Sequence, residues 1–92
     1  MTKIIWTNSA IKDLERIFDH ISLDSKVYAK ALIEDILDSA DRLEMFSKSG
    51  RMVPEIGKEN VRELLVGNHR VIYDIKQSSA RILTVIHGAR KL

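Results

Sequence analysis

The sequence contains no cysteine, one proline and four glycines in 92 residues, and only 5% of its residues are aromatic. Without cysteine, disulfide scaffolds, thiol catalysis and zinc sites built on thiolates are excluded. No apolar run approaches the roughly 20 residues that a membrane-spanning helix needs. Residues 1–6 lack the long apolar stretch and cleavage site of a signal peptide, so we expect a cytoplasmic protein without membrane contact. A chain of this length has room for one hydrophobic core, so residues 1–92 are expected to form a single domain.

Charge is distributed unevenly along the chain, although the formal net charge is only +2. Residues 1–46 carry six basic and nine acidic side chains, whereas residues 47–92 carry nine basic and four acidic ones. The first half is therefore at −3 and the second half at +5, which indicates that the second half meets an anionic partner. The alternative is that both surfaces serve only solubility.

A short strand followed by an amphipathic helix is predicted at the N-terminus. Residues 3–7 are β-branched and aromatic, and Asn8 or Ser9 is able to cap a helix. Apolar residues then recur at helical spacing, at Ala10, Ile11, Leu14, Ile17, Phe18 and Ile21. This stripe is expected to face the core, and the polar residues between its members, Asp13 included, are expected to face solvent.

A second, longer amphipathic helix is predicted after a break at residues 22–25, with Asp24 or Ser25 as its cap. Its buried face is expected to comprise Ala29, Leu32, Ile33, Ile36, Leu37, Ala40, Leu43 and Phe46. The helix is expected to end within residues 47–50, where Gly50 supplies a left-handed stop. Because few residues join the two helices, they are expected to form an antiparallel hairpin.

The period of the pattern changes after residue 50. Residues 51–60 are predicted as a loop or short edge segment, and three strands are predicted at residues 61–66, 69–76 and 81–87. Gly67 and Asn68 tolerate positive φ, which favours a two-residue hairpin that places Val66 opposite His69. The order β-α-α-β-β-β predicts an α+β fold, with the antiparallel helical hairpin packed on one face of a small, mostly antiparallel sheet.

The two faces of this predicted strand hairpin differ in chemistry. One face is apolar and is expected to pack on the helices: Leu64, Val66, Val71, Tyr73 and Ile75. The other face mixes charge with aliphatic side chains and is expected to be an exposed partner-binding surface: Glu63, Leu65, Arg70, Ile72 and Asp74. If Ile75 pairs with Ile82 across the next turn, His87 lies opposite Arg70 on this mixed face, and a one-residue slip would remove it.

Few residues are placed for chemistry. The sequence has no Gly-rich phosphate loop, no HExxH motif and no Ser-His-Asp order. His20, His69 and His87 are far apart in the sequence, so no metal site is expected, and His20 is expected to be solvated. What remains is a set of cations predicted on the sheet side: Arg51, Lys58, Arg62, Arg70, His87, Arg90 and Lys91.

Arg70 is the most informative member of this set. It follows a tight turn, and strand alternation directs it away from the helices. Its planar fork of donors suits a carboxylate or phosphate of a partner. The alternative is a cross-strand ion pair with Glu63, which lies diagonally across from it on the same face, and the two interpretations can coexist.

Several segments, taken in chain order, resemble one family of small proteins. They are Trp6, Ala10, Asp13, Leu14, Ile17 and Ile21 near the N-terminus, then Gly50, Arg51, Pro54 and Glu55, and finally Arg62 to Leu64, His69 to Tyr73 and Ile82 to Arg90. Over nearly the whole chain, this combination resembles the RelE/ParE superfamily of toxins. The resemblance implies the toxin of a type II toxin–antitoxin pair, a system that stabilises plasmids, with an antitoxin whose flexible tail wraps over the toxin.

The superfamily has two activities, and the resemblance allows each to be compared with this sequence. RelE-like members cleave messenger RNA on the ribosome, which requires a proton acceptor, a proton donor and cations for the developing phosphorane charge. Neither position that matches a strand lysine of those members carries a cation here, and no tyrosine follows Arg90. For a nuclease, the resemblance implies Glu55 as base, His87 as acid, and Arg70 and Arg90 for charge stabilisation.

ParE-like members instead inhibit DNA gyrase, and the run from Val85 to Arg90 is similar to theirs. The resemblance therefore favours a gyrase inhibitor without cofactor or metal, neutralised by a cognate antitoxin with an acidic, amphipathic segment. A non-toxic nucleic-acid-binding module is a further alternative, although no aromatic residues interleave the basic ones as a stacking platform. The residues expected to contact the antitoxin or target are Arg51, Arg62, Glu63, Leu65, Arg70, Ile72, His87, Arg90 and Lys91.

Overall fold

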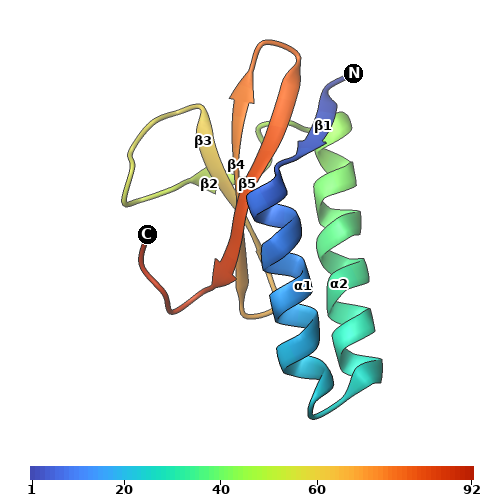
Figure 1. The fold of residues 1–92 in the computed structure, drawn as a ribbon. Coiled ribbons are helices and arrows are strands. Elements are labelled where there is room, and N and C mark those ends of the chain that lie inside the picture. Colours follow the sequence, from blue (N-terminus) through green and yellow to red (C-terminus); the bar gives the residue numbers. More distant parts are fainter.

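Two helices pack on one side of a five-stranded sheet in the computed structural model, which describes all residues from 1 to 92. The elements in chain order are β1 (Lys3–Trp6), α1 (Asn8–Ser22), α2 (Lys26–Asp41), a 3₁₀ turn η1 (Arg42–Glu44), β2 (Arg51–Met52), β3 (Val61–Val66), β4 (His69–Lys76) and β5 (Ser79–His87). The β2–β3 connection (residues 53–60) and the C-terminal tail (residues 88–92) lie on the side of the sheet opposite the helices (Figure 1). Neither helix is long and apolar enough to cross a bilayer.

The sheet is mixed, with strand order β1-β5-β4-β3-β2. β1 runs parallel to β5, and the other neighbouring strands are antiparallel. The helical hairpin forms the connection between β1 and the rest of the sheet and covers one face (Figure 1). The predicted α+β fold is therefore confirmed, including the short edge strand that the sequence allowed within residues 51–60.

Side chains that precede the helices fix where both begin. Thr7, rather than Asn8 or Ser9, is the cap of α1: its Oγ1 accepts a hydrogen bond from the Ala10 backbone N–H at 3.2 Å. The same hydroxyl donates to the Ile82 carbonyl at 2.7 Å, so the cap also ties the helix to β5. Ser25 caps α2 by accepting from the Tyr28 N–H, as predicted.

The second helix ends earlier than expected, at Asp41, and continues only as the 3₁₀ turn η1. Gly50 is not a left-handed stop, because the glycines with positive φ are Gly57 and Gly67. A glycine is required at position 50 for a different reason. A Cβ there would lie 2.6 Å from the Glu63 carbonyl oxygen and 2.7 Å from the Tyr73 hydroxyl, which accepts a hydrogen bond from the Gly50 N–H.

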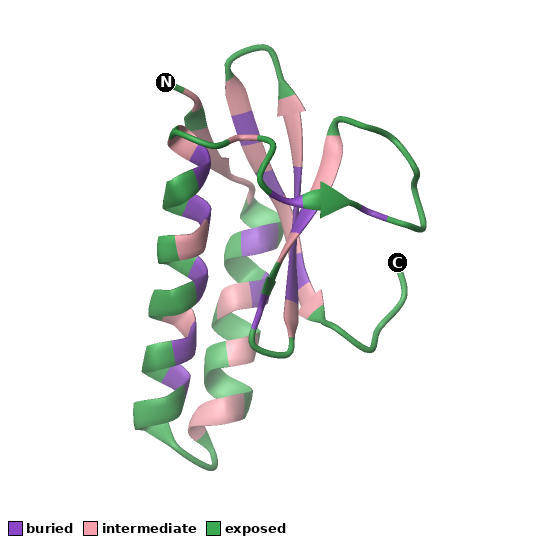
Figure 2. Cartoon of the chain, turned by 180° about the vertical axis from the view of Figure 1, so that it is seen from behind, coloured by how far each residue is buried: buried purple, intermediate pink, exposed green.

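The core lies between the helices and the sheet. Its buried members come from both layers: Ala10, Leu32, Ile36, Ala40, Leu43, Val66, Val71, Tyr73, Ala80, Ile82 and Val85. Figure 2 shows the buried positions of α2 along the side of the helix that faces the sheet. The apolar stripes are wider than this core, because Ile11, Phe18, Leu37 and Phe46, all expected inside, are exposed at its rim.

The register of the β3–β4 hairpin agrees with the prediction at every pair. Val66 lies opposite His69, and the ladder continues to Arg62 opposite Tyr73. Gly67 adopts a φ of 56°, which is the positive value that this tight turn needs. The face predicted to be apolar packs on the helices, so the turn chemistry was sufficient to set which side chains enter the core.

The register of β4 with β5 differs from the prediction because a two-residue turn joins the strands and because β5 contains a β-bulge. Tyr73 pairs with Ile82, but its neighbour Ile72 pairs with Thr84, so Leu83 is an extra residue in β5. A bulge of this kind leaves no signature in the alternation of a short apolar strand, since both registers bury aliphatic residues. The strand also begins at Ser79, directly after a two-residue turn, rather than at residue 81.

His87 consequently lies opposite His69, and Ile86 takes the place opposite Arg70. Ile75 pairs with Ala80 instead of Ile82, a two-residue difference from the expected register that the extra Leu83 reduces to one residue at Arg70. The predicted placement of His87 beside Arg70 on the mixed face is therefore wrong. The slip instead brings two histidines together at the end of the β4–β5 ladder.

Asp13 is buried rather than exposed to solvent as its helical phase suggested. Its Oδ2 accepts hydrogen bonds from the Thr84 hydroxyl at 2.6 Å and from the Val85 backbone N–H at 3.0 Å, and its Oδ1 pairs with Arg16. β1 pairs with β5 only as far as Ile82, so beyond that point this carboxylate supplies the partner that the Val85 N–H lacks in the sheet. The interaction joins α1 directly to β5.

Replacing Asp13 with Ala is expected to lower the free energy of unfolding by about 1.5–3 kcal/mol, because two donors on β5 lose a charged acceptor. Asp19→Ala, on the exposed part of the same helix, should change it by less than about 0.5 kcal/mol. Urea unfolding of both variants measures the difference. Equal effects of the two substitutions would show that Asp13 does not anchor the helix.

Candidate functional site

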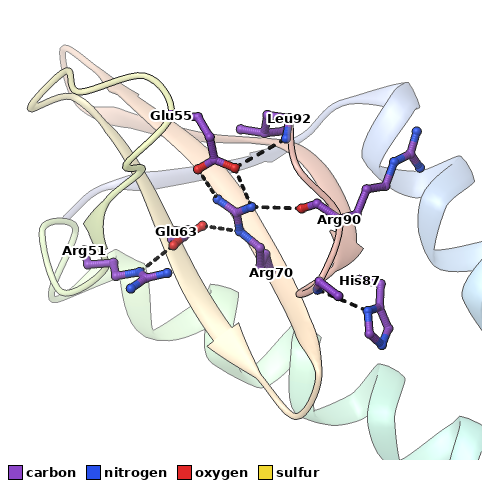
Figure 3. Close-up of polar contacts among 8 residues, drawn as sticks. Arg51, Glu55, Glu63, Arg70, His87, Arg90 and Leu92 are labelled. Atoms are coloured by element: carbon purple, nitrogen blue, oxygen red, sulfur yellow. Dashed lines mark hydrogen bonds and ion pairs between the residues drawn. The ribbon is translucent and has the colours of Figure 1, made fainter.

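Arg70 on β4 is the centre of an ion network on the sheet face opposite the helices. Its guanidinium side chain is only 6% exposed, although the sequence predicted an outward, accessible position. Nε donates to Glu63 on β3 at 2.6 Å, and the two Nη atoms donate to the two oxygens of Glu55 at 2.8 Å each. Arg70 is therefore accessible neither to solvent nor to a partner, and its fork is occupied by this chain's own carboxylates (Figure 3).

The same guanidinium fixes two irregular segments over the sheet. Glu55 belongs to the connection between β2 and β3, and its carboxylate also accepts a 3.4 Å hydrogen bond from the Leu92 N–H. Arg70 Nη1 donates in addition to the Arg90 carbonyl at 3.1 Å. One buried side chain thus holds the β2–β3 connection and the C-terminal tail together, which explains why this face is closed (Figure 3).

Glu63 carries the second half of the network. Its side chain is fully buried, and its other oxygen accepts from the more exposed Arg51 on the neighbouring strand β2. Of the two interpretations of Arg70 offered by the sequence, the diagonal ion pair with Glu63 is present, and the free cationic fork is not. The four side chains Arg51, Glu63, Arg70 and Glu55 together carry no net charge, so they do not form a cationic surface.

Of the remaining predicted contact residues on the sheet, some are buried or engaged by this chain and one is exposed. Ile72 is buried, like Val53 at the start of the β2–β3 connection, so it is not an accessible apolar surface. Leu65 is 60% exposed and stays available. Arg62 donates to the backbone carbonyls of Glu59 and Gly50, so its guanidinium serves to hold loops. The expected exposed surface of mixed charge and apolar side chains is therefore reduced to Leu65 and its surroundings.

An open groove of about 800 Å³ lies between α1, the end of β5 and the C-terminal tail. We call it the α1–β5 groove. Its cationic and histidine side chains are Arg16, His20, His69, His87, Arg90 and Lys91, and its apolar wall includes Ile17, Ile21 and Ile86. Asp13 is the one acidic side chain that lines it, and both carboxylate oxygens of Asp13 are already engaged. The groove is therefore a cationic surface with an apolar wall.

The fold brings all three histidines to this groove, which the sequence spacing did not reveal. His20 reaches it from α1, whereas His69 and His87 come from adjacent strands, with ring centroids 5.6 Å apart and a T-shaped arrangement. Burial lowers the pKa of His69, and the nearby His87 lowers it further. No group of three or more histidine and carboxylate side chains is placed to hold a metal ion.

A complete acid–base set is not assembled from the residues proposed for catalysis. The hydrogen bonds from Arg70 lower the pKa of Glu55 from 4.5 to about 2, far below the value that suits a general base near neutral pH. These bonds also raise the pKa of Arg70. The His87 ring lines the groove, and its Nδ1 accepts a hydrogen bond from the Ala89 N–H. The proposed base is thus committed to a structural ion pair.

Replacing Arg70 with Ala is expected to lower the free energy of unfolding by about 3–5 kcal/mol, because Glu63 would keep a buried charge without its buried partner. Arg51→Ala removes the exposed partner of the same carboxylate and should cost about 1 kcal/mol or less. Chemical unfolding of the two variants compares them directly. A loss below about 1 kcal/mol for Arg70→Ala would contradict the structural role assigned to this arginine.

The ion pair also makes stability depend on pH in the acid range. The pKa of Glu55 is lowered by folding, so its contribution is fully present above pH 4.5 and is lost as the pH falls toward about 2. The urea midpoint should therefore decrease over this range in the native sequence. Glu55→Gln should show a shallower decrease, and an identical pH profile for both proteins would contradict the assignment.

Comparison with known proteins agrees with this fold. The family model described as the ParE toxin of type II toxin–antitoxin systems, parDE, matches residues 4–92. A solved structure described as the chromosomal ParDE TA system from P. aeruginosa aligns with a TM-score of 0.77, covering 95% of this chain and 96% of that one at 24% identity. At this identity the likeness concerns the fold. No curated protein matches closely enough to count as a relative. Because the family model spans almost all of the sequence, the chain belongs to the ParE toxin family of type II toxin–antitoxin systems.

Proposed function

We propose that the chain inhibits DNA gyrase and that a cognate antitoxin neutralises it by occupying the α1–β5 groove. The observation that carries the proposal is the match of the ParE toxin model to residues 4–92. A toxin of such a system acts on a cellular target and is held inactive by a protein partner. The proposal therefore requires a surface of the chain that suits a protein partner.

The α1–β5 groove has the chemistry that an acidic, amphipathic antitoxin segment requires. Arg90, Lys91 and His87, three of the contact residues expected from the sequence, line it together with the apolar Ile17 and Ile21 of α1. Apolar burial on the groove wall would supply most of the affinity, and the cations would supply register and fast encounter. The outward sheet face is less suitable, since Arg70 and Ile72 are buried there.

Two features of the site favour a binding mechanism over ribosome-dependent cleavage of messenger RNA. Glu55 and Arg70, which a nuclease of this superfamily would use, neutralise each other in the ion network. The lowered pKa of Glu55 makes it a weak proton acceptor. A gyrase inhibitor needs no acid–base pair on its own surface, because it acts by occupying and trapping its target.

Two assays on the purified chain separate the activities. We expect inhibition of DNA supercoiling by purified gyrase, accompanied by linear DNA from trapped cleavage complexes, and relief of both by the antitoxin encoded beside the toxin gene. A reaction with programmed ribosomes should leave the message intact. Message cleavage together with unaffected supercoiling would overturn the proposal in favour of an endoribonuclease.

The groove assignment has its own test in charge reversal. The double substitution Arg90→Glu and Lys91→Glu should weaken the antitoxin complex at least tenfold, because two cations of the groove become repulsive toward an acidic segment. The double substitution Lys58→Glu and Lys76→Glu, at two exposed cations outside the groove, is the matched control and should change the affinity less than threefold. Calorimetric titration measures the affinity of the antitoxin for the native chain, for the groove variant and for the control variant. Equal weakening by the control would indicate a general charge effect rather than a groove.

A further inference from the structure

We propose that His69 and His87 form a subsite in the α1–β5 groove that binds one carboxylate of the antitoxin and takes up a proton as it does so. The inference rests on the proposed function, since it assigns chemistry to the partner that occupies the same groove. It adds a specific contact and a regulatory consequence that the family assignment does not contain.

The first observation is the pairing of the two imidazoles. His69 opens β4 and His87 closes β5, and the ladder places them directly opposite each other. Their rings meet edge to face with centroids 5.6 Å apart, and both line the groove. Two imidazoles at this distance are able to direct N–H groups at one shared acceptor, whereas two positive charges left without an anion would repel each other.

The second observation is that one ring nitrogen lacks a partner. His69 Nδ1 is buried and makes no hydrogen bond, which is uncommon for a buried polar atom and costs free energy, so a small rearrangement of this ring toward an acceptor is favoured. His87 Nδ1 instead accepts from the Ala89 N–H at 3.2 Å. That bond assigns the proton of neutral His87 to Nε2, so this ring already offers a donor.

The third observation is the excess of positive charge around the pair. The other charged and titratable side chains that line the same groove are Asp13, Arg16 and His20 from α1, Tyr28 from α2, and Arg90 and Lys91 from the tail. Asp13 is the single carboxylate among them, and Arg16, Thr84 and the Val85 N–H occupy it. No side chain of this groove is therefore free to neutralise a charged histidine pair. The carboxylate of an incoming antitoxin would neutralise it.

Proton uptake follows from the state of the free groove. Burial and the proximity of His87 lower the pKa of His69, so its neutral form predominates at neutral pH in the free chain. A carboxylate bound beside it would favour the charged form and raise that pKa. The affinity for the antitoxin should then increase as the pH falls from 8 to 6, by at most tenfold per pH unit for one proton.

The test is calorimetric titration of the chain with its antitoxin at pH 8, 7 and 6, in buffers of different ionisation enthalpy. We expect net uptake of a fraction of a proton, approaching one, in the native complex. His69→Gln should weaken the complex and remove the pH slope, whereas His20→Gln, on the α1 wall of the same groove, should retain the slope. A slope that is unchanged in His69→Gln, or zero uptake in the native complex, would overturn the inference.

A second measurement is independent of the antitoxin and of whether the variant folds. Histidine side-chain resonances of the native chain, titrated with sodium glutarate, should show a higher pKa for His69 than in chloride of equal ionic strength. Inorganic phosphate is the comparison anion: a response to phosphate with none to glutarate would assign the subsite to a phosphate ligand and contradict our proposal. If charge reversal at Arg90 and Lys91 leaves the complex intact while His69 still binds glutarate, the groove assignment fails and the anion subsite stands.

Discussion

The ion pairs of one buried arginine determine which face of this molecule is available to partners. Arg70 is shared between Glu63 on the neighbouring strand and Glu55 on a connection that would otherwise extend into solvent. Because burying an unpaired guanidinium or carboxylate is costly, these three groups are stable in this position only together. Their mutual dependence keeps the β2–β3 connection and the C-terminal tail on the sheet, and the face opposite the helices is closed.

The closed sheet face and the open groove share one segment, the C-terminal tail. The tail that is held by Arg70 through the Arg90 carbonyl also carries the side chains of Arg90 and Lys91 to the rim of the α1–β5 groove. The backbone of this segment therefore belongs to the ion network, and its side chains belong to the groove. A neutral network thus positions a cationic binding surface, to which the second half of the sequence contributes Arg90 and Lys91.

Much of the fold was accessible from the sequence because local chemistry determined it. The Gly67-Asn68 turn specified a complete strand register, and helical periodicity located both helices. The β4–β5 register was missed because neither the two-residue turn nor the bulge at Leu83 leaves a mark in the alternation of these strands. The contact of Asp13 with Thr84 and Val85 was missed as well, because it spans more than 70 residues. No local pattern distinguishes a buried acidic residue of this kind from a solvated one on an amphipathic helix.

The candidate site was less accessible, for the same physical reason. The ion pair of Arg70 with Glu63 was foreseen as an alternative, since both lie on one hairpin. Glu55 comes from a loop without periodicity, so its bidentate contact, and with it the burial of Arg70, could not be deduced. The convergence of His20, His69 and His87 requires a helix, two strands and the shifted register at once. The sequence indicated a cationic binding site only through the excess of basic residues in its second half.

The partner is expected to bind the α1–β5 groove and not the sheet face closed by Arg70. Methyl chemical shifts of the chain, recorded free and in complex with its antitoxin, show which of the two surfaces is covered. Large changes are expected for Ile17, Ile21 and Ile86 in the groove, with small ones for Leu65 and Ile72. Large changes at Leu65 and Ile72, with the groove methyl groups unaffected, would contradict this expectation.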